Sequence, residues 1–252
     1  MVKKIFIISL QKSAHRREYI SNLFNQNHIE FEFFDAFDGG LHIQNDFEIK
    51  FNLTNGELGC LYSHLLLYKK IQKENICEAL VLEDDIIFDN RFLTFHKNWL
   101  KNKKKTSIEI LKLGYSDCQS FVYDLPILVN IFTKTSYNKM TIARPIEKSF
   151  GSYAYLITKI GSAKMIDIIS NQLSPIDVLL HESPRYGVRF YVVLNQLVYP
   201  NFDFDSIIRN EHSHLMITKK QKGKLELKHR LSIVKKSFLN YLHSNFYSHL
   251  ID

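Results

Sequence analysis

The chain has 252 residues, of which 45% are hydrophobic, so it can bury a core of its own but is too short to divide into several domains. No stretch approaches the roughly 18 consecutive apolar residues that a membrane-spanning helix needs. The three cysteines, Cys60, Cys77 and Cys118, are odd in number and widely spaced, which argues against a disulfide framework and against a zinc site built from cysteine pairs. We interpret them as reduced thiols of a cytosolic protein.

The net charge of +7 is concentrated at one end of the chain. Residues 219–252 hold eight Lys or Arg and two acidic residues, a net charge of +6, which leaves +1 for the rest. A nearly neutral body argues against a nucleic-acid partner, because such proteins carry a basic surface through the fold. We therefore predict one domain over residues 1–218 and a basic helical tail over residues 219–252.

The first forty residues predict a β-α-β unit. The apolar run at residues 5–10 is too brief for a signal peptide and is soon followed by Arg16 and Arg17. We interpret it as a parallel strand that is buried on both faces. A helix with an apolar side around Ile20 follows, and residues 30–37 have the composition of a second strand.

A second helix and a third strand follow. Thr54 and Glu57 have the spacing of a capping box, in which hydroxyl and carboxylate each bind a free amide at a helix start. The helix is expected to extend to about Ile71, and residues 78–82 form a short apolar strand. The strand ends abruptly in three carboxylates, Glu83, Asp84 and Asp85.

The rest of the body continues this alternation. Further strands are predicted at residues 108–113, 151–157 and 190–198, and helices within residues 86–99 and around residues 163–169. Residues 175–177 are expected to end the last of these helices. Residues 116–148 lack a clear period, which fits either a flexible loop over a site or irregular surface. The pattern predicts an α/β sandwich around a mainly parallel sheet.

The three clustered carboxylates are the first candidate site. In open α/β sheets, ligands bind beyond the carboxyl ends of the strands. Neighbouring carboxylates repel one another unless a cation neutralises them, and Mg²⁺ or Mn²⁺ often joins a carboxylate to substrate phosphates. The alternative is a solvated acidic turn that merely ends a strand, and the triplet alone does not separate the two.

A set of motifs in matching order resembles glycosyltransferase family 25, the bacterial lipooligosaccharide galactosyltransferases with relatives that galactosylate collagen. The most specific part is Gly-Glu-x-Gly-Cys-x-x-Ser-His at residues 56–64 followed by Glu-Asp-Asp at residues 83–85. Supporting segments are residues 7–10 with Arg16 and Arg17, residues 35–39, residues 151–155 with Gly161 and Ala163, and residues 175–177. The resemblance covers roughly the first four-fifths of the chain.

The resemblance implies a GT-A-like fold, a UDP-sugar donor, with UDP-galactose the expected one, and an inverting transfer to a lipooligosaccharide or related glycan. Glu83-Asp84-Asp85 then takes the place of an Asp-x-Asp motif, with Asp85 as ligand to Mn²⁺ or Mg²⁺ and Glu83 or Asp84 binding the donor. Some GT-A enzymes place a third metal ligand after the final strand, where His212 and His214 lie; the alternative for both is a surface loop.

An inverting transfer needs a base that takes the proton of the acceptor hydroxyl. Asp177 is our first choice, and the alternative is an ordinary loop aspartate. Besides the acidic triplet, the expected donor-binding residues are Ser9, Arg17, Asp38, Glu57 and His64. Arg17 is favoured over Arg16 for the diphosphate, with Arg16 at the surface. Glu57 has the capping box as its alternative role, and His64 has core packing.

The tail predicts a basic amphipathic helix from residue 227, with apolar residues at helical spacing from Leu231 to Leu242. Such a helix suits the anionic inner face of a membrane, where a lipid-linked acceptor is assembled. It equally suits docking on the body or on a second subunit. We therefore expect a cytoplasmic protein, which binds peripherally to the membrane if the tail helix lies on lipid.

Two other functions compete with glycosyl transfer. One is another metal-dependent transferase, such as a nucleotidyltransferase, although the sequence lacks a usual Gly-rich phosphate loop. The other is a non-enzymatic module that binds a membrane or nucleic acid through the tail.

Overall fold

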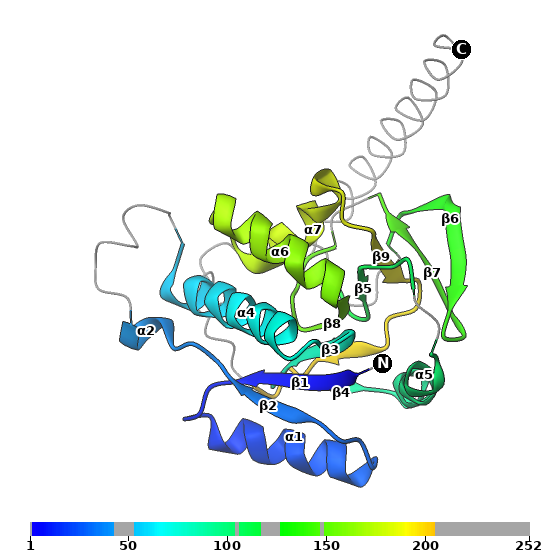
Figure 1. Ribbon diagram of the computed structural model, residues 1–252. Helices are drawn as coiled ribbons and strands as arrows, with labels where there is room; N and C mark the ends of the chain where they lie inside the picture. Colours follow the sequence, from blue (N-terminus) through cyan, green and yellow to red (C-terminus); the bar gives the residue numbers. More distant parts are fainter. Residues whose placement is uncertain (1, 43–52, 104–105, 117–126, 147–148, 205–252) are drawn as a thin grey trace, which may run out of the picture.

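An eight-stranded mixed sheet forms the centre of the computed structural model (Figure 1). The residues that the structure describes are 2–42, 53–103, 106–116, 127–146 and 149–204. In order across the sheet, the strands are β2 (Glu32–Asp35), β1 (Lys3–Ser9), β3 (Glu78–Glu83), β8 (Ala154–Thr158), β5 (Ile110–Lys112), β9 (Phe190–Val193), β7 (Met140–Pro145) and β6 (Val129–Tyr137). A second, two-stranded sheet pairs β4 (Ile86–Phe88) with β10 (Val198–Pro200).

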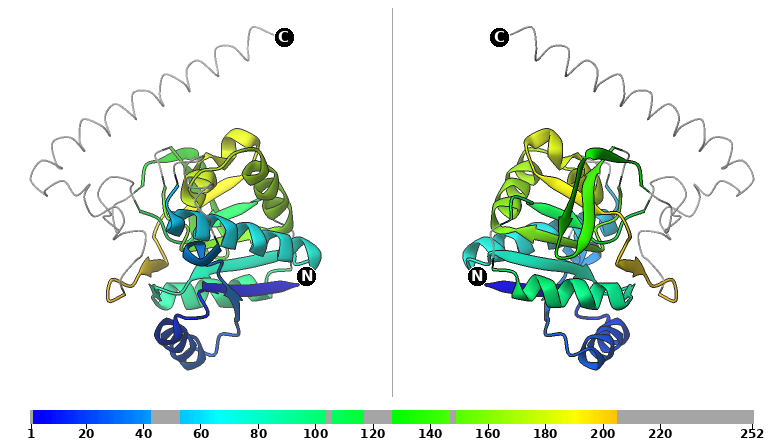
Figure 2. Two further views of the ribbon diagram at one scale, coloured as in Figure 1. Left: turned by 90° about the vertical axis from the view of Figure 1, so that its left-hand side faces the viewer. Right: turned by 90° about the vertical axis from the view of Figure 1, so that its right-hand side faces the viewer.

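Helices cover both faces of the main sheet. The helices are α1 (Ala14–Gln26), α2 (Gly39–His42), α4 (Asn55–Lys73), α5 (Asn90–Lys101), α6 (Lys159–Asn171), α7 (Ile176–Glu182) and the 3₁₀ helix η1 (Ser183–Tyr186). Helices α4 and α6 pack together on one face, and α1 lies on the other (Figures 1 and 2). This arrangement confirms the predicted α/β sandwich. The predicted tail, the boundary after residue 218, and His212 and His214 lie outside the described residues.

The strands nearest the acidic triplet are parallel and deeply buried. β1 pairs in parallel with β2 and with β3, and Phe6 and Ile7 have no exposed surface. A strand covered on both faces reads as a continuous apolar run, which is the pattern of residues 5–10. The register sets Ile8 beside Glu83. The ends of β1 and β3 therefore meet at one edge, where α/β sheets bind ligands.

Helix α4 begins as its sequence predicts. The Thr54 side chain accepts a hydrogen bond from the Glu57 amide at 3.2 Å, and the Glu57 carboxylate accepts one from the Thr54 amide at 2.9 Å. Leu58, Leu61 and other apolar side chains of α4 are buried in the core. The cap and this buried face fix where α4 starts and which side chains it presents to the sheet.

The segment predicted to lack regular structure contains a β-hairpin, so that expectation was wrong for residues 129–145. β6 and β7 pair antiparallel, and the turn places Asn138 and Lys139 at φ values of 49° and 67°. The turn was missed because it lacks the glycine that usually marks such a turn. β6 is the outer strand of the sheet, and its Ile131 and Phe132 side chains are 70% and 73% exposed.

Two further predictions about the second half of the chain were wrong. Residues 175–177 do not end α6; Pro175 is the N-cap of the short helix α7, and Asp177 lies in the first turn of that helix. The fixed φ of proline suits a helix start as well as a stop. The late strand at residues 190–198 is two strands, β9 and β10, which belong to different sheets.

Candidate functional site

The carboxylates that follow β3 face two different sides of the sheet. Glu83 accepts a hydrogen bond from the Ser152 hydroxyl at 2.6 Å. Asp84 accepts one from the Ser9 hydroxyl at 2.7 Å and one from Arg16 Nη1 at 2.7 Å. Successive residues of an extended chain point in opposite directions, so the triplet supplies groups to two separate environments.

The Asp84 side is built by the end of β1 and the start of α1. Arg16 Nη1 bonds to one Asp84 oxygen and lies 3.7 Å from an Asp85 oxygen. Arg17 instead donates to the Ser9 carbonyl at 2.8 Å and to the Leu10 carbonyl at 3.2 Å. Arg16 therefore contacts the carboxylates, whereas Arg17 binds the backbone between β1 and α1.

Asp85 is anchored through its backbone. Its carbonyl oxygen accepts a hydrogen bond from the Asn201 amide at 2.6 Å, and the residue is 9% exposed. Asn201 directly follows β10, and β10 pairs with β4, which begins at Ile86. The small second sheet thus fixes the position of Asp85 beyond the end of β3.

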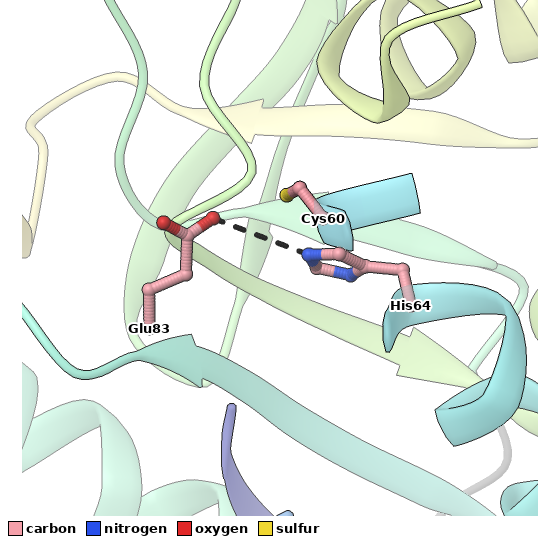
Figure 3. Close-up of side chains that lie close together, drawn as sticks. All are labelled: Cys60, His64 and Glu83. Carbon is pink, nitrogen blue, oxygen red and sulfur yellow. Dashed lines mark ion pairs between the residues drawn. The ribbon is translucent and has the colours of Figure 1, made fainter. Parts of the chain in front are cut away.

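The Glu83 side is built by β3, the first turns of α4 and the segment before β8. Glu83 Oε1 lies 4.0 Å from His64 Nε2, and Cys60 Sγ lies near both side chains (Figure 3). Burial, and next the charge of Asp85, raise the pKa of Glu83. A cation at this point would relieve that crowding of carboxylates.

Two tyrosine hydroxyls form a hydrogen-bonded chain that ends on the His64 ring. His64 Nδ1 is 2.6 Å from the Tyr155 hydroxyl, which is 2.6 Å from the Tyr68 hydroxyl. Burial lowers the pKa of His64 to about 3, so the ring is neutral at pH 7. Among the residues that the structure describes, Nε2 has no hydrogen-bond partner although it is buried, and it faces Glu83 and Cys60 (Figure 3).

Two more charged groups act on this side. Lys112 of β5 is fully buried, and its Nζ donates to the carbonyls of Ser149 and Gly151 at 2.5 Å each. Burial lowers the pKa of Lys112 to about 7, against the opposing charges of Asp177 and Glu83. The charge of Asp177, in the first turn of α7, also acts on Glu83. Lys112 also fixes the segment that presents Ser152.

Comparison with known proteins identifies the family. The model of glycosyltransferase family 25 (LPS biosynthesis protein) matches residues 2–180. The chain belongs to glycosyltransferase family 25. The resemblance seen in the sequence is thereby confirmed, and the GT-A-like sandwich that it implied is the fold of this chain.

Individual relatives agree with the family match. The chain is 29% identical to the lipooligosaccharide biosynthesis protein lic2B of Haemophilus influenzae over 193 residues, which are 69% of this chain and 68% of that protein. It is 28% identical to procollagen galactosyltransferase 1-A of Xenopus laevis over 103 residues, 35% of this chain and 17% of that protein. Among solved structures, a glycosyltransferase involved in glycosylation of the major capsid of PBCV-1 is similar with a TM-score of 0.45 and 10% identity, over 86% of this chain and 100% of that chain. A structural likeness of that size carries no argument about function.

Contacts with the segment after β2 explain two residues of the family motif at residues 56–64, Gly59 and Ser63. A Cβ on Gly59 would lie 2.9 Å from the Phe37 carbonyl oxygen, so only glycine permits this approach. Ser63 accepts a hydrogen bond from the Phe37 amide at 2.8 Å and donates to the Gly59 carbonyl at 2.6 Å. Glycine and serine thus join α4 to the segment after β2, while Cys60 and His64 face the site.

Two predicted donor-binding residues lie away from the Glu83 contacts. The Glu57 carboxylate is occupied by the capping box of α4. Asp38 forms an ion pair with Lys12 and accepts a hydrogen bond from the Gly40 amide at 3.1 Å. Both roles remain predictions, because no ligand contact tests them.

Sequence reasoning missed three members of this site. Ser152 and Lys112 gave no local signal, since each acts through a contact with a distant strand. Cys60 did give one, because it lies four residues before His64 and such pairs share a helix face.

None of the helices in the described part of the chain combines the length and the apolar character needed to cross a membrane.

Proposed function

We propose that the chain is an inverting glycosyltransferase that moves galactose from UDP-galactose to a lipooligosaccharide or a related glycan. The observation that carries the proposal is the acidic triplet at the carboxyl end of a buried strand, with Asp177 close enough for its charge to act on Glu83. The family supports the reaction class, and its galactosyltransferase relatives support the sugar.

The residues fit a divalent metal at Asp85. Asp84 accepts hydrogen bonds from Ser9 and Arg16, and Asp85 is the last carboxylate of the triplet, held beyond the end of β3 by the Asn201 amide. Carboxylate oxygens are the donors that Mn²⁺ and Mg²⁺ prefer, and burial, followed by the charge of Asp85, raises the pKa of Glu83 beside it. When bound, such a metal would neutralise the charge of the departing nucleotide diphosphate.

The protein's own groups supply positioning and proton transfer. In the proposed reaction the acceptor oxygen attacks the anomeric carbon, the bond to UDP breaks on the opposite side, and Asp177 takes the acceptor proton. Arg16 lies at the triplet and is the cation best placed to contact diphosphate oxygens. This differs from the initial preference for Arg17, whose guanidinium binds backbone carbonyls and Asp35.

The test is nucleotide release from a panel of nucleotide sugars, measured with Mn²⁺, with Mg²⁺ and with a chelator. We expect metal-dependent release of UDP from UDP-galactose above all other donors, and its loss in Asp85→Asn. Asp167→Asn, at an exposed site of α6, is the matched control. Release of pyrophosphate would favour a nucleotidyltransferase, and release of UDP from a different donor would correct the sugar.

The membrane association is proposed on the tail alone. Residues 219–252 carry a net charge of +6 with apolar residues at helical spacing, which suits anionic lipid near a lipid-linked acceptor. Removing these residues should release the protein from anionic liposomes. Equal binding of the shortened and full chains would contradict the proposal and favour a tail that docks on protein.

A further inference from the structure

Cys60, His64 and Glu83 bring three different metal-binding atoms together. The sulfur, the imidazole nitrogen and a carboxylate oxygen all lie within 4.8 Å of one another (Figure 3). Ligands of a tetrahedral zinc ion lie about 3.5 Å apart, given bonds of roughly 2.0 to 2.3 Å. Small rotations of the Cys60 and Glu83 side chains would close the remaining gap.

The histidine is the independent observation that points to a ligand. His64 is fully buried and its Nε2 faces the other two groups without a hydrogen-bond partner among the described residues. An unpaired buried polar atom costs about 1 to 3 kcal/mol, so a bound cation would remove a real penalty. The opposite nitrogen already contacts the Tyr155 hydroxyl, as metal-binding histidines usually contact a second group that fixes the ring.

We propose that Cys60, His64 and Glu83 bind one Zn²⁺, with the fourth position open to water or a ligand. The donor set of sulfur, nitrogen and one oxygen suits zinc and not Mn²⁺ or Mg²⁺, which prefer oxygen. Cys60 and Glu83 are only partly buried, which provides an entry path and leaves the fourth position accessible. The zinc would join the start of α4 to the end of β3.

This site is distinct from the metal proposed at Asp85. Cys60 and His64 belong to α4 and not to the acidic triplet, so this donor set selects a different ion from the carboxylate oxygens at Asp85. The inference does not depend on sugar transfer, because zinc binding is measured without a donor. Failure of one proposal therefore leaves the other standing.

The experiment uses the full chain after removal of metal by a chelator. Co²⁺ is added as a spectroscopic substitute for zinc, and a thiolate-to-cobalt absorption band in the near ultraviolet is recorded before displacement by Zn²⁺. We expect one thiolate-bound ion per chain, with its affinity reduced by more than about a hundredfold in Cys60→Ser and His64→Gln. Tyr155→Phe, which removes only the supporting hydroxyl, should cost about 10-fold to 100-fold.

Cys77→Ser is the matched control. Cys77 is also a partly buried free thiol, and it directly precedes β3, at the end of the strand opposite Glu83. The control should bind cobalt and zinc as the unmodified protein does. Absence of the absorption band in the unmodified protein, or an equal loss in the Cys77 and Cys60 variants, would overturn the proposal.

A measurement on the unmodified protein covers the case in which a variant fails to fold. Zn²⁺ should slow alkylation of Cys60 by at least about tenfold without changing that of Cys77, with the modified cysteine located by peptide mass spectrometry. Mg²⁺ should give no protection. Equal alkylation of Cys60 with and without Zn²⁺ would refute the site.

Discussion

The two sides of the acidic triplet differ in how completely their polar groups are paired. On the Asp84 side, Ser9 and Arg16 occupy both carboxylate oxygens. On the Glu83 side, a buried imidazole nitrogen has no hydrogen-bond partner in the described part of the chain, and burial and neighbouring charge raise the pKa of the carboxylate. The paired carboxylate of Asp84 stabilises the fold, whereas the unsatisfied groups beside Glu83 are available to a substrate or a metal.

The largest expected effect comes from the proposed base. Asp177→Asn keeps the size of the side chain and removes its ability to accept a proton, so kcat for transfer should fall about 10²-fold to 10⁴-fold. Steady-state kinetics with a saturating donor measures the change. Asp167→Asn should leave kcat unaltered, and a similar kcat in both variants would assign the proton to another group.

A substitution at Asp84 should change the stability of the protein. Asp84→Asn removes the carboxylate that binds Arg16, whose guanidinium is largely buried, and should lower the free energy of unfolding by about 2 kcal/mol. Urea denaturation measures this loss. An unchanged midpoint would show that the Arg16 contact does not stabilise the fold.

Lys112 should give the Glu83 side a distinctive pH dependence. Its pKa is about 7 in the folded chain and 10.5 as a free side chain, so between these values the unfolded chain holds a proton that the folded chain has lost. Stability should therefore rise with pH in this window, by at most about 1.4 kcal/mol per pH unit. Urea denaturation at pH 7 and pH 9 should show this rise in the unmodified chain relative to Lys112→Met. Parallel pH curves for the two proteins would contradict it.

The smallest effect is expected at Glu83 itself. Glu83→Gln removes one of several crowded negative charges and keeps an oxygen for the Ser152 hydroxyl. In the presence of a chelator, the free energy of unfolding should stay constant or rise by up to about 1 kcal/mol. A clear decrease in the free energy of unfolding, in the urea assay that is used for Asp84→Asn, would show that Glu83 stabilises the fold as Asp84 does.

The sequence predicted the helices and strands that position the site more accurately than it predicted the contacts within the site. The capping box at Thr54 and the apolar run of β3 placed α4 and the triplet, because both signals are local. The choice between Arg16 and Arg17 depended on which of two neighbours in the first turn of α1 points toward the triplet, and the sequence pattern did not determine that. The divergence of Glu83 from Asp84 follows from strand alternation, but their partners come from segments far along the chain.

Pairings between distant segments account for most of what was missed. Ser152 contacts Glu83 only because β8 runs antiparallel beside β3. A lysine is usually a surface residue, so nothing in the sequence indicated that Lys112 is buried in β5. The hairpin of β6 and β7 was overlooked because its turn has Lys139 where glycine usually follows the asparagine.

The outer strand β6 has a consequence for how the protein behaves at high concentration. An open sheet edge can recruit a strand from another molecule and start aggregation. Where the β6 register shifts, the Phe132 amide is bonded to the Asn130 side chain at 3.0 Å, and the Thr133 hydroxyl binds the Asn130 carbonyl at 2.7 Å and the Arg144 amide at 2.9 Å. The Phe132 amide and the Asn130 carbonyl are therefore already occupied, so an incoming strand would meet an interrupted ladder beside the exposed Phe132, which would disfavour self-association through this edge.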